Sequence, residues 1–354
     1  MKVASFGLFC FAITAFASPG DKLDEFRECT DACEYQRRCA QSRISSTDFS
    51  SNVFRGIEFG ETPVVLKWGL FWDCVADCDY QCQQVITRER IAYGEEIFQF
   101  HGKWPFIRLL GMQELFSVIF SIGNFLPHYY GLKKLQNRLS KLQHRGNVDL
   151  KPGVLLRNYM MVAMAGMFAW TASSVFHLRD LMITEKLDYF FAGGTVLSGF
   201  HAIFSRIARL DKHPRLARVF TWSVISIFAL HILRLYVDWS YTYNMRFNVF
   251  YGLLQYFLLL LLAYRNYTTL KGQQKSKSKS HAGHVKLISQ LCIMPIILVV
   301  ATASAMSLEI FDFFDYGWQI DAHALWHLCT IWPSWALYDF FIADFNFITK
   351  EATD

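Results

Sequence analysis

The chain has 354 residues, of which 53% are hydrophobic, 17% aromatic and only 18% charged. This composition is too apolar for an ordinary soluble protein and predicts a polytopic membrane protein. The net charge of +5 arises from Lys and Arg residues gathered in short stretches between apolar runs, a pattern that excludes one contiguous nucleic-acid-binding surface.

The N-terminus has the features of a signal peptide. Lys2 precedes an apolar run from Val3 to Phe16, and the small-residue pattern Ala15-Phe16-Ala17 stands just before Ser18. The run is too short to span a bilayer, which disfavours the alternative of a signal anchor. We therefore expect residues 1–17 to be cleaved and the next segment to enter the secretory lumen.

A cysteine-rich lumenal domain is expected over residues 18–104, a segment without a span-length apolar run. An even number of cysteines in an oxidising lumen predicts disulfides, and their helical spacing suits two helices linked together. A zinc or redox motif would place two residues between cysteines, whereas here there are three or more, so that alternative is disfavoured. The spacing leaves all 15 pairings open. The six residues are Cys29, Cys33, Cys39, Cys74, Cys78 and Cys82.

Apolar stretches close to the ~20 residues that cross a bilayer follow over residues 105–345. They predict an all-α membrane domain, a bundle of seven transmembrane helices. The predicted spans are approximately 105–130, 154–178, 187–204, 219–237, 247–264, 286–306 and 322–341.

Charge asymmetry orients these spans. The loops after the first, third and fifth spans are rich in Lys and Arg, the third-span loop running from Arg206 to Arg218. The loop between the sixth and seventh spans instead carries four acidic residues and no Lys or Arg. The positive-inside rule places the basic loops in the cytosol, which agrees with a lumenal N-terminus and predicts a cytosolic tail over residues 346–354.

Five polar side chains then fall at one depth, near the lumenal face. Ser173 and His177 end the second span one helical turn apart, and Asp188 begins the third. His323 and His327, also one turn apart, begin the seventh. Ionisable groups inside a membrane are costly, so their convergence from three spans favours a functional site over separate helix-to-helix hydrogen bonds.

Three imidazoles with an open fourth position are the ligand set of a catalytic Zn²⁺ site, which predicts His177, His323 and His327 as metal ligands. We expect Asp188 to accept a proton from water or to orient a ligand, and Ser173 to donate a hydrogen bond to a developing oxyanion. These two residues are therefore the predicted catalytic residues.

Further acidic residues could support the metal ligands. Glu114 in the first span is one candidate, although structural pairing is favoured for it. Asp312 and Asp321 lie close enough in sequence to orient His323, but a solvated acidic loop explains them equally well.

The motifs Ser173-x-x-x-His177, Asp188 and His323-x-x-x-His327 together resemble those of the CREST superfamily of membrane hydrolases, which includes alkaline ceramidases and adiponectin receptors. The segments 98–106 (FQFHGKWPF), 173–180 (SSVFHLRD) and 320–327 (IDAHALWH), with the signal peptide and the six cysteines, resemble the family of post-GPI attachment to proteins factor 3. The resemblance covers essentially the whole chain beyond the signal peptide.

That resemblance implies a GPI-remodelling phospholipase A2. It would act in the endoplasmic reticulum membrane, chosen over the Golgi on family grounds, and would remove the unsaturated sn-2 acyl chain from glycosylphosphatidylinositol (GPI)-anchored proteins. The implied partners are GPI-anchored proteins and membrane lipids. Two alternatives stay open: a ceramidase-like amide hydrolase, which the cysteine-rich domain disfavours, and a non-enzymatic receptor or folding factor with structural zinc. The oligomeric state is also left open.

Overall fold

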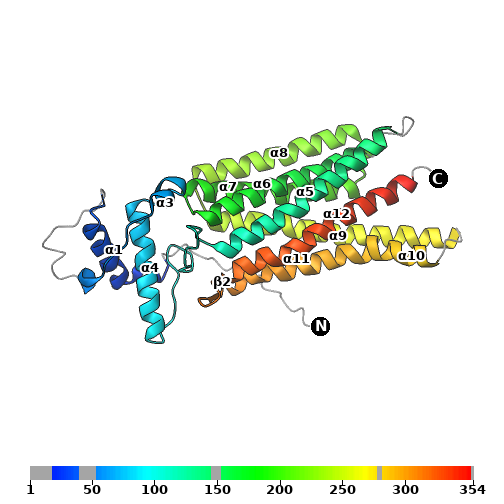
Figure 1. Ribbon diagram of the computed structural model, residues 1–354. Coiled ribbons are helices and arrows are strands. Elements are labelled where there is room, and N and C mark those ends of the chain that lie inside the picture. Colours follow the sequence, from blue (N-terminus) through cyan, green and yellow to red (C-terminus); the bar gives the residue numbers. More distant parts are fainter. Residues whose placement is uncertain (1–17, 40–52, 145–152, 277–280, 352–354) are drawn as a thin grey trace, which may run out of the picture. The chain divides into compact units, whose positions relative to one another are not determined.

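The structure is a computed structural model that describes residues 18–39, 53–144, 153–276 and 281–351 (Figure 1). The predicted signal peptide and the last three residues of the predicted tail lie outside this described part. The chain divides into two units. Unit 1 comprises Met1–Glu114 with Phe314–Gln319, and unit 2 comprises Leu115–Phe313 with Ile320–Asp354.

Unit 1 is built around two helices, α1 and α4. The side chain of Asp73 caps α4 by accepting a hydrogen bond from the backbone N–H of Ala76 at 2.8 Å, which satisfies one of the donors left open at a helix start. Phe26 and Ile86 are buried between the helices with the cysteines. The elements are η1 (Gly20–Lys22), α1 (Asp24–Gln36), η2 (Val53–Gly56), α3 (Val64–Gly69), α4 (Cys74–Ala92) and β1 (Phe314–Asp315).

Three disulfides join α1 and the residues just after it to α4, which confirms the expected pair of linked helices. The pairs are Cys29–Cys82, Cys33–Cys78 and Cys39–Cys74. Partner numbers fall along α4 as they rise along α1, so the two helices run antiparallel. All six sulfurs are oxidised, so none is a thiolate available to a metal.

Asp77 carries a buried carboxylate in unit 1. It accepts hydrogen bonds from Arg37 at 2.7 Å and from Thr62 at 2.8 Å, and it pairs with Arg108. Burial alone would raise the pKa of this carboxyl group, but the hydrogen bonds from Arg108, Thr62 and Arg37 outweigh it and hold the pKa below its ordinary value. The ion pairs therefore stabilise the unit above the unfolded-state pKa, and this contribution is lost as pH falls through the folded-state pKa.

Unit 2 is a bundle of long helices. α5 begins at Leu115, ten residues after the expected start at Pro105, whose carbonyl instead accepts a hydrogen bond from Gln84 within unit 1. The elements are α5 (Leu115–His144), α6 (Gly153–Leu178), α7 (Met182–Ile207), η3 (Leu210–Lys212), α8 (Pro214–Val237), α9 (Tyr241–Ser276), α10 (His281–Ile288), the π-helical turn η4 (Ser289–Ile293), α11 (Met294–Phe311), β2 (Ile320–Asp321) and α12 (Ala322–Glu351).

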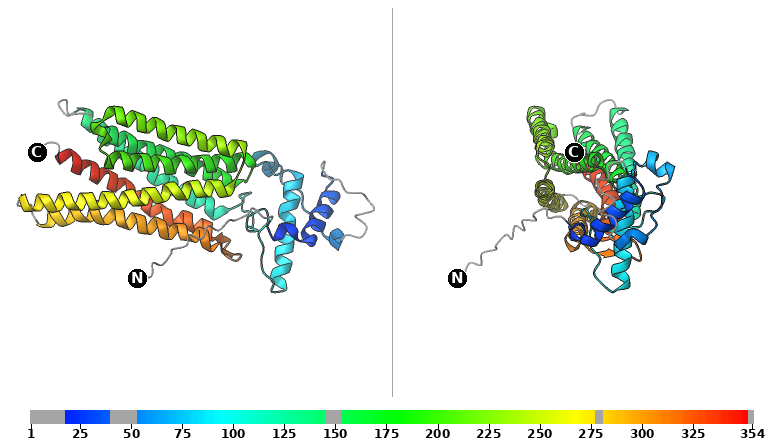
Figure 2. Two further views of the ribbon diagram at one scale, coloured as in Figure 1. Left: turned by 180° about the vertical axis from the view of Figure 1, so that it is seen from behind. Right: turned by 90° about the vertical axis from the view of Figure 1, so that its left-hand side faces the viewer.

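The helices of unit 2 close on one another. α5 packs on α6, α6 on α7, α7 on α9, α9 on α11, α11 on α12, and α12 returns to α5. α8 packs outside this ring, on α7, and the end-on view in Figure 2 shows it at the edge of the bundle. This closure brings α12, the last helix, between α5 and α11, so residues far apart in the sequence meet.

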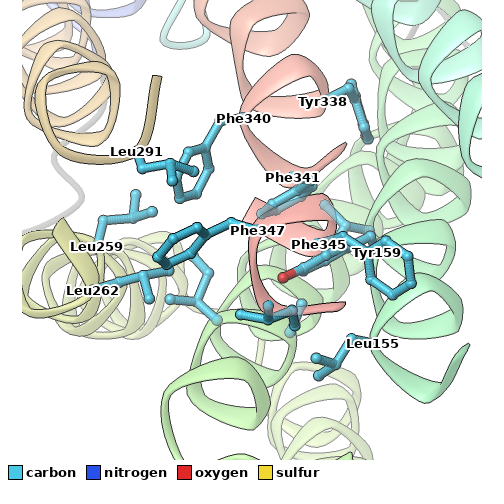
Figure 3. Packing of buried hydrophobic residues seen from close by; sticks show 14 of the residues in the cluster. Leu155, Tyr159, Leu259, Leu262, Leu291, Tyr338, Phe340, Phe341, Phe345 and Phe347 are labelled. Carbon is cyan, nitrogen blue, oxygen red and sulfur yellow. The ribbon is translucent and has the colours of Figure 1, made fainter. Parts of the chain in front are cut away.

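Aromatic side chains of α12 fill the core of the bundle (Figure 3). The ring of Phe341 stacks on Tyr159 of α6 with centroids 4.0 Å apart and planes 4° apart. Phe340 and Phe347 lie toward the side chains of α9 and η4 in the same view. Because α12 packs on α5, α6 and α11, its place in the bundle is fixed from several sides.

Within the residues that the structure describes, four helical segments are long and apolar enough to cross a membrane. They are Gly153–Leu178, Pro214–Val237, Tyr241–Gln273 and Gly283–Glu309. These segments confirm an all-α membrane protein with a disulfide-rich N-terminal region, and the count of seven spans stays a prediction.

Arg206 lies elsewhere than the charge pattern suggested. We expected it in a cytosolic loop, but it is the penultimate residue of α7 and is buried, where it forms an ion pair with Asp344 of α12. Spacing along one segment could not reveal this partner, 138 residues away in the chain.

Candidate metal centre

The three predicted histidine ligands lie at one end of the bundle. His177 is in the last turn of α6, and His323 and His327 are in the first two turns of α12. The side chain of Asp321 fixes the start of α12, since its Oδ1 accepts a hydrogen bond from the backbone N–H of Ala324 at 2.8 Å. The i, i+4 spacing then directs both α12 imidazoles to the same face.

The imidazoles converge as the sequence predicted. One ligand atom from each of the three lies within 4.8 Å of those of the other two. Nε2 of His323 is 3.3 Å from Nε2 of His177. Two nitrogens bound to one zinc at ~2.0–2.1 Å in tetrahedral geometry are also roughly 3.3 Å apart, so this donor set fits the ion.

Ser121 of α5 orients the ring of His327 through a contact at Nδ1. Its Oγ lies 2.9 Å from Nδ1 of His327, and the carbonyl of Ser117 lies 3.3 Å from the same nitrogen. Asn124, one turn further along α5, donates to the backbone carbonyl of His327 at 2.6 Å. With Nδ1 directed at these oxygens, Nε2 is the nitrogen of His327 that suits a metal.

Ser173 lies beside the same group. It is buried on α6, and its Oγ is 3.0 Å from Oγ of Ser121. The two hydroxyls and the His327 ring therefore form one continuous hydrogen-bonded chain. Ser121 was missed at the sequence level, although its spacing from Ser117 and Asn124 places all three on one face of α5 and could have indicated it.

Glu309 is a second residue that sequence reasoning did not assign to the site. It lies near the end of α11, and its Oε1 is 2.5 Å from Nδ1 of His323. A histidine that binds metal through one nitrogen usually donates the other N–H to a carboxylate or carbonyl. At the sequence level, Glu309 was treated only as one of the four acidic residues of the loop before the seventh span. Its position as the first acidic residue after an apolar span could have indicated a role at the site.

The remaining predicted residues have different positions. Asp188 lies half-buried in the second turn of α7 and is not one of the three residues whose donor atoms converge. Glu114 pairs with Lys103 within unit 1. Asp321 is the α12 cap described above, and Asp312 ends α11 in the left-handed backbone region with φ of 34°. Any catalytic role of Asp188 stays a prediction.

The centre is buried on one side and open on the other. His177 and His327 are 2% and 1% exposed, whereas the His323 side chain is 34% exposed. The indole of Trp170 stands edge-on to His327 with ring centroids 5.1 Å apart. The group is therefore accessible at His323, while Trp170 covers the ring of His327.

Fold and site together define a helical membrane protein with a three-histidine group suited to a metal at one end of its bundle. Comparison with known proteins gives the particular family. Residues 63–345 match the Per1-like family, and the chain belongs to it.

Relatives confirm the predicted resemblance to post-GPI attachment to proteins factor 3. Protein PER1 of Saccharomyces cerevisiae is 59% identical over 96% of this chain and 95% of its own length. "GPI-specific phospholipase A2-like PGAP3" of Xenopus tropicalis is 30% identical over 97% of this chain and 95% of its own length. "Post-GPI attachment to proteins factor 3" of Drosophila melanogaster is 30% identical over 91% and 87%. No solved structure matches the chain.

Proposed function

We propose that this chain hydrolyses the sn-2 acyl ester of the phosphatidylinositol in GPI-anchored proteins, giving lyso-GPI and a free fatty acid. The observation that carries the proposal is the convergence of His177, His323 and His327 at the end of a membrane bundle. The names of the relatives supply the substrate class.

His177, His323 and His327 would hold a zinc ion. When bound, such an ion polarises a carbonyl and lowers the pKa of water to about 7, which makes hydroxide available at neutral pH. A zinc ligand offers the lone pair of one ring nitrogen, and the contacts of this chain leave Nε2 of His323 and of His327 for that role. Glu309 accepts the Nδ1 proton of His323, and Ser121 accepts that of His327.

The direction of the serine chain follows from that tautomer. His327 donates through Nδ1 to Oγ of Ser121, so the hydroxyl of Ser121 is left to donate to Oγ of Ser173. Oγ of Ser173 then accepts the hydrogen bond from Ser121, and the hydroxyl proton of Ser173 is directed away from Ser121. This supports the predicted role of Ser173 as a donor to the oxyanion of the ester.

The reaction adds water across the ester. The water oxygen bonds to the acyl carbon, the bond from that carbon to the glycerol oxygen breaks, and the glycerol oxygen leaves with a proton as the sn-2 hydroxyl. Asp188 is the proposed acceptor for the first proton, which it would return to the leaving oxygen. The hydrolase would sit in the endoplasmic reticulum membrane with this end of the bundle, and the N-terminus, in the lumen.

Mass spectrometry of GPI anchors tests this function. In cells that lack the chain, we expect unsaturated sn-2 acyl groups to persist on GPI-anchored proteins, and the native chain to restore remodelling. The purified chain in nanodiscs should release fatty acid from the same anchors. Unchanged anchors in the deficient cells would refute the substrate, and release of fatty acid from ceramide instead would indicate the amide hydrolase.

Glu309→Gln is expected to lower the rate of sn-2 deacylation about 10–100-fold, because the amide accepts the Nδ1 proton of His323 less strongly than a carboxylate does. Zinc affinity, measured by competition with a chelator, should fall with it. The matched control is Asp238→Asn, since that carboxylate pairs with Arg234 at the end of α8. Equal effects of the two substitutions on zinc affinity would show that Glu309 does not position His323.

A further inference from the structure

Unit 1 holds large apolar side chains out of its core. Trp68 on α3 is 76% exposed, Leu110 is 83% exposed and Trp318 is 77% exposed. Large exposed apolar patches on a folded domain commonly mark surfaces that contact a membrane, a ligand or another protein. The group, here termed the apolar rim, consists of Val64, Val65, Trp68, Phe71, Leu110 and Trp318.

The α3 helix and the turn from Leu109 to Met112 form one structure. Gly111 has a φ of +83°, and a Cβ there would lie 2.4 Å from Leu66 and 2.8 Å from Leu70, so only glycine allows this close approach. The indole N–H of Trp72 donates to the carbonyl of Gly111 at 3.2 Å. The exposed side chains on either side of this contact are therefore held in place by a packed base.

Two rim residues adopt an unfavourable backbone conformation. Phe71 has a φ of 55° and Leu110 a φ of 54°, in the left-handed region that bulky residues rarely occupy. Such a conformation is unfavourable for a bulky residue, and here each one presents a large apolar side chain to solvent. Backbone strain that exposes apolar groups points to an apolar medium around them.

The chain itself places the rim near a membrane surface. Leu110 precedes Leu115, the start of α5, by five residues, so the two Cα atoms are at most ~18 Å apart. Within unit 2, the contact of Ser121 with Ser173 shows that α5 starts where α6 ends, and α6 is a candidate span. Residues shortly before Leu115 are thus close to the end of a membrane-spanning segment.

A second connection reaches the same part of unit 1. Phe314–Gln319 belongs to this unit and begins three residues after the end of α11, which forms most of the candidate span Gly283–Glu309. The backbone N–H of Ile107 donates to Oε1 of Gln319 at 2.6 Å, and Trp104 stacks on Phe314 with centroids 5.4 Å apart. Trp318 therefore lies in a segment joined both to a span and to the strand of chain that carries Leu110.

We propose that the apolar rim inserts into the interfacial region of the bilayer leaflet in which α5 begins, and that phospholipid is the partner that its side chains contact. Tryptophan is enriched at this depth because its ring is amphipathic. Lys67, exposed on the same short helix, provides a cation for lipid phosphate. The rim anchors the cysteine-rich domain to the membrane surface, and this anchoring does not depend on the proposed hydrolysis.

Site-specific photo-crosslinking of the full chain in phosphatidylcholine proteoliposomes tests the insertion. p-Benzoylphenylalanine replaces Trp68 in one variant and Leu110 in a second. Tyr93 is the control position, because it is 82% exposed but follows the far end of α4, roughly 28 Å along the helix from Cys74. Peptide mapping without reduction checks that the three disulfides have formed, and the second rim position provides the test if one variant fails to fold.

We expect phosphatidylcholine adducts at rim positions to exceed those at Tyr93 by at least about tenfold, as for a side chain surrounded by lipid. Lipid labelling equal to that at Tyr93 would overturn the proposal. Crosslinks to protein in place of lipid would also overturn it, and a crosslinked species of twice the chain mass would identify the rim as a contact with a second copy.

Discussion

His327→Ala is expected to lower sn-2 deacylation by well over a hundredfold and to reduce bound zinc below one ion per chain. His327 is 1% exposed and is fixed by Ser121 on its ring and Asn124 on its backbone, so no neighbouring side chain can take its place without moving a helix. Loss of a residue that only orients a ligand typically costs 10–100-fold, and loss of the ligand itself should exceed that.

Two measurements separate this effect from misfolding. Anchor lipids are compared by mass spectrometry in cells rescued at equal expression, and zinc is counted in the purified proteins by elemental mass spectrometry. His201→Ala is the control, because that imidazole is also on a bundle helix but bonds to Thr221 at 2.9 Å. Full activity and full zinc content in the His327 variant would refute the three-histidine centre.

The centre shows what spacing can and cannot predict. The i, i+4 histidines of α12 and His177 could be placed at one depth because charge-based topology fixes which span ends share a membrane face. Ser121 and Glu309 contact these rings from α5 and α11, helices that join the site only through the closure of the bundle. Lateral neighbours of this kind depend on packing, which a hydropathy pattern does not contain.

In the fold, too, the sequence predicted the span lengths but not the features that depend on packing. Apolar length predicted α6 and α8 to within about five residues at each end, since a span must match the bilayer. The start of α5 was missed because Pro105 and Phe106 are apolar yet are buried in unit 1, so composition alone assigned them to the span. The disulfide pairing needed the antiparallel arrangement of α1 and α4, which cysteine spacing does not specify.

Arg206 and Asp344 form a buried ion pair that the charge pattern of the sequence did not reveal. Arg206 entered the topology prediction as a basic loop residue, whereas the structure places it in α7 and buries it. Its Nε and Nη2 donate to the two carboxylate oxygens of Asp344 at 2.5 and 2.9 Å, and Asn266 of α9 donates to the same carboxylate at 3.1 Å. This network joins α7, α9 and α12 at the end of the bundle remote from the histidines.

Asp344→Ala is expected to destabilise the folded chain by about 3–5 kcal/mol, because it leaves the guanidinium of Arg206 buried without its counter-charge. Asp339→Ala is the matched control on the same helix. That carboxylate is 67% exposed and pairs with the half-exposed Lys134, so its loss should cost at most about 1 kcal/mol. The measurement is the thermal unfolding midpoint of the purified chains in one detergent.

The double variant Arg206→Met with Asp344→Leu separates the cost of an orphaned charge from the value of the pair itself. Replacing both partners of a buried ion pair with apolar groups is often neutral, so the double variant should recover most of the stability lost in Asp344→Ala. Equal losses for Asp344→Ala and Asp339→Ala would show that water reaches Arg206 in the folded chain. A double variant less stable than Asp344→Ala would show instead that the hydrogen bonds among Arg206, Asp344 and Asn266 contribute more than the desolvation of the charges costs.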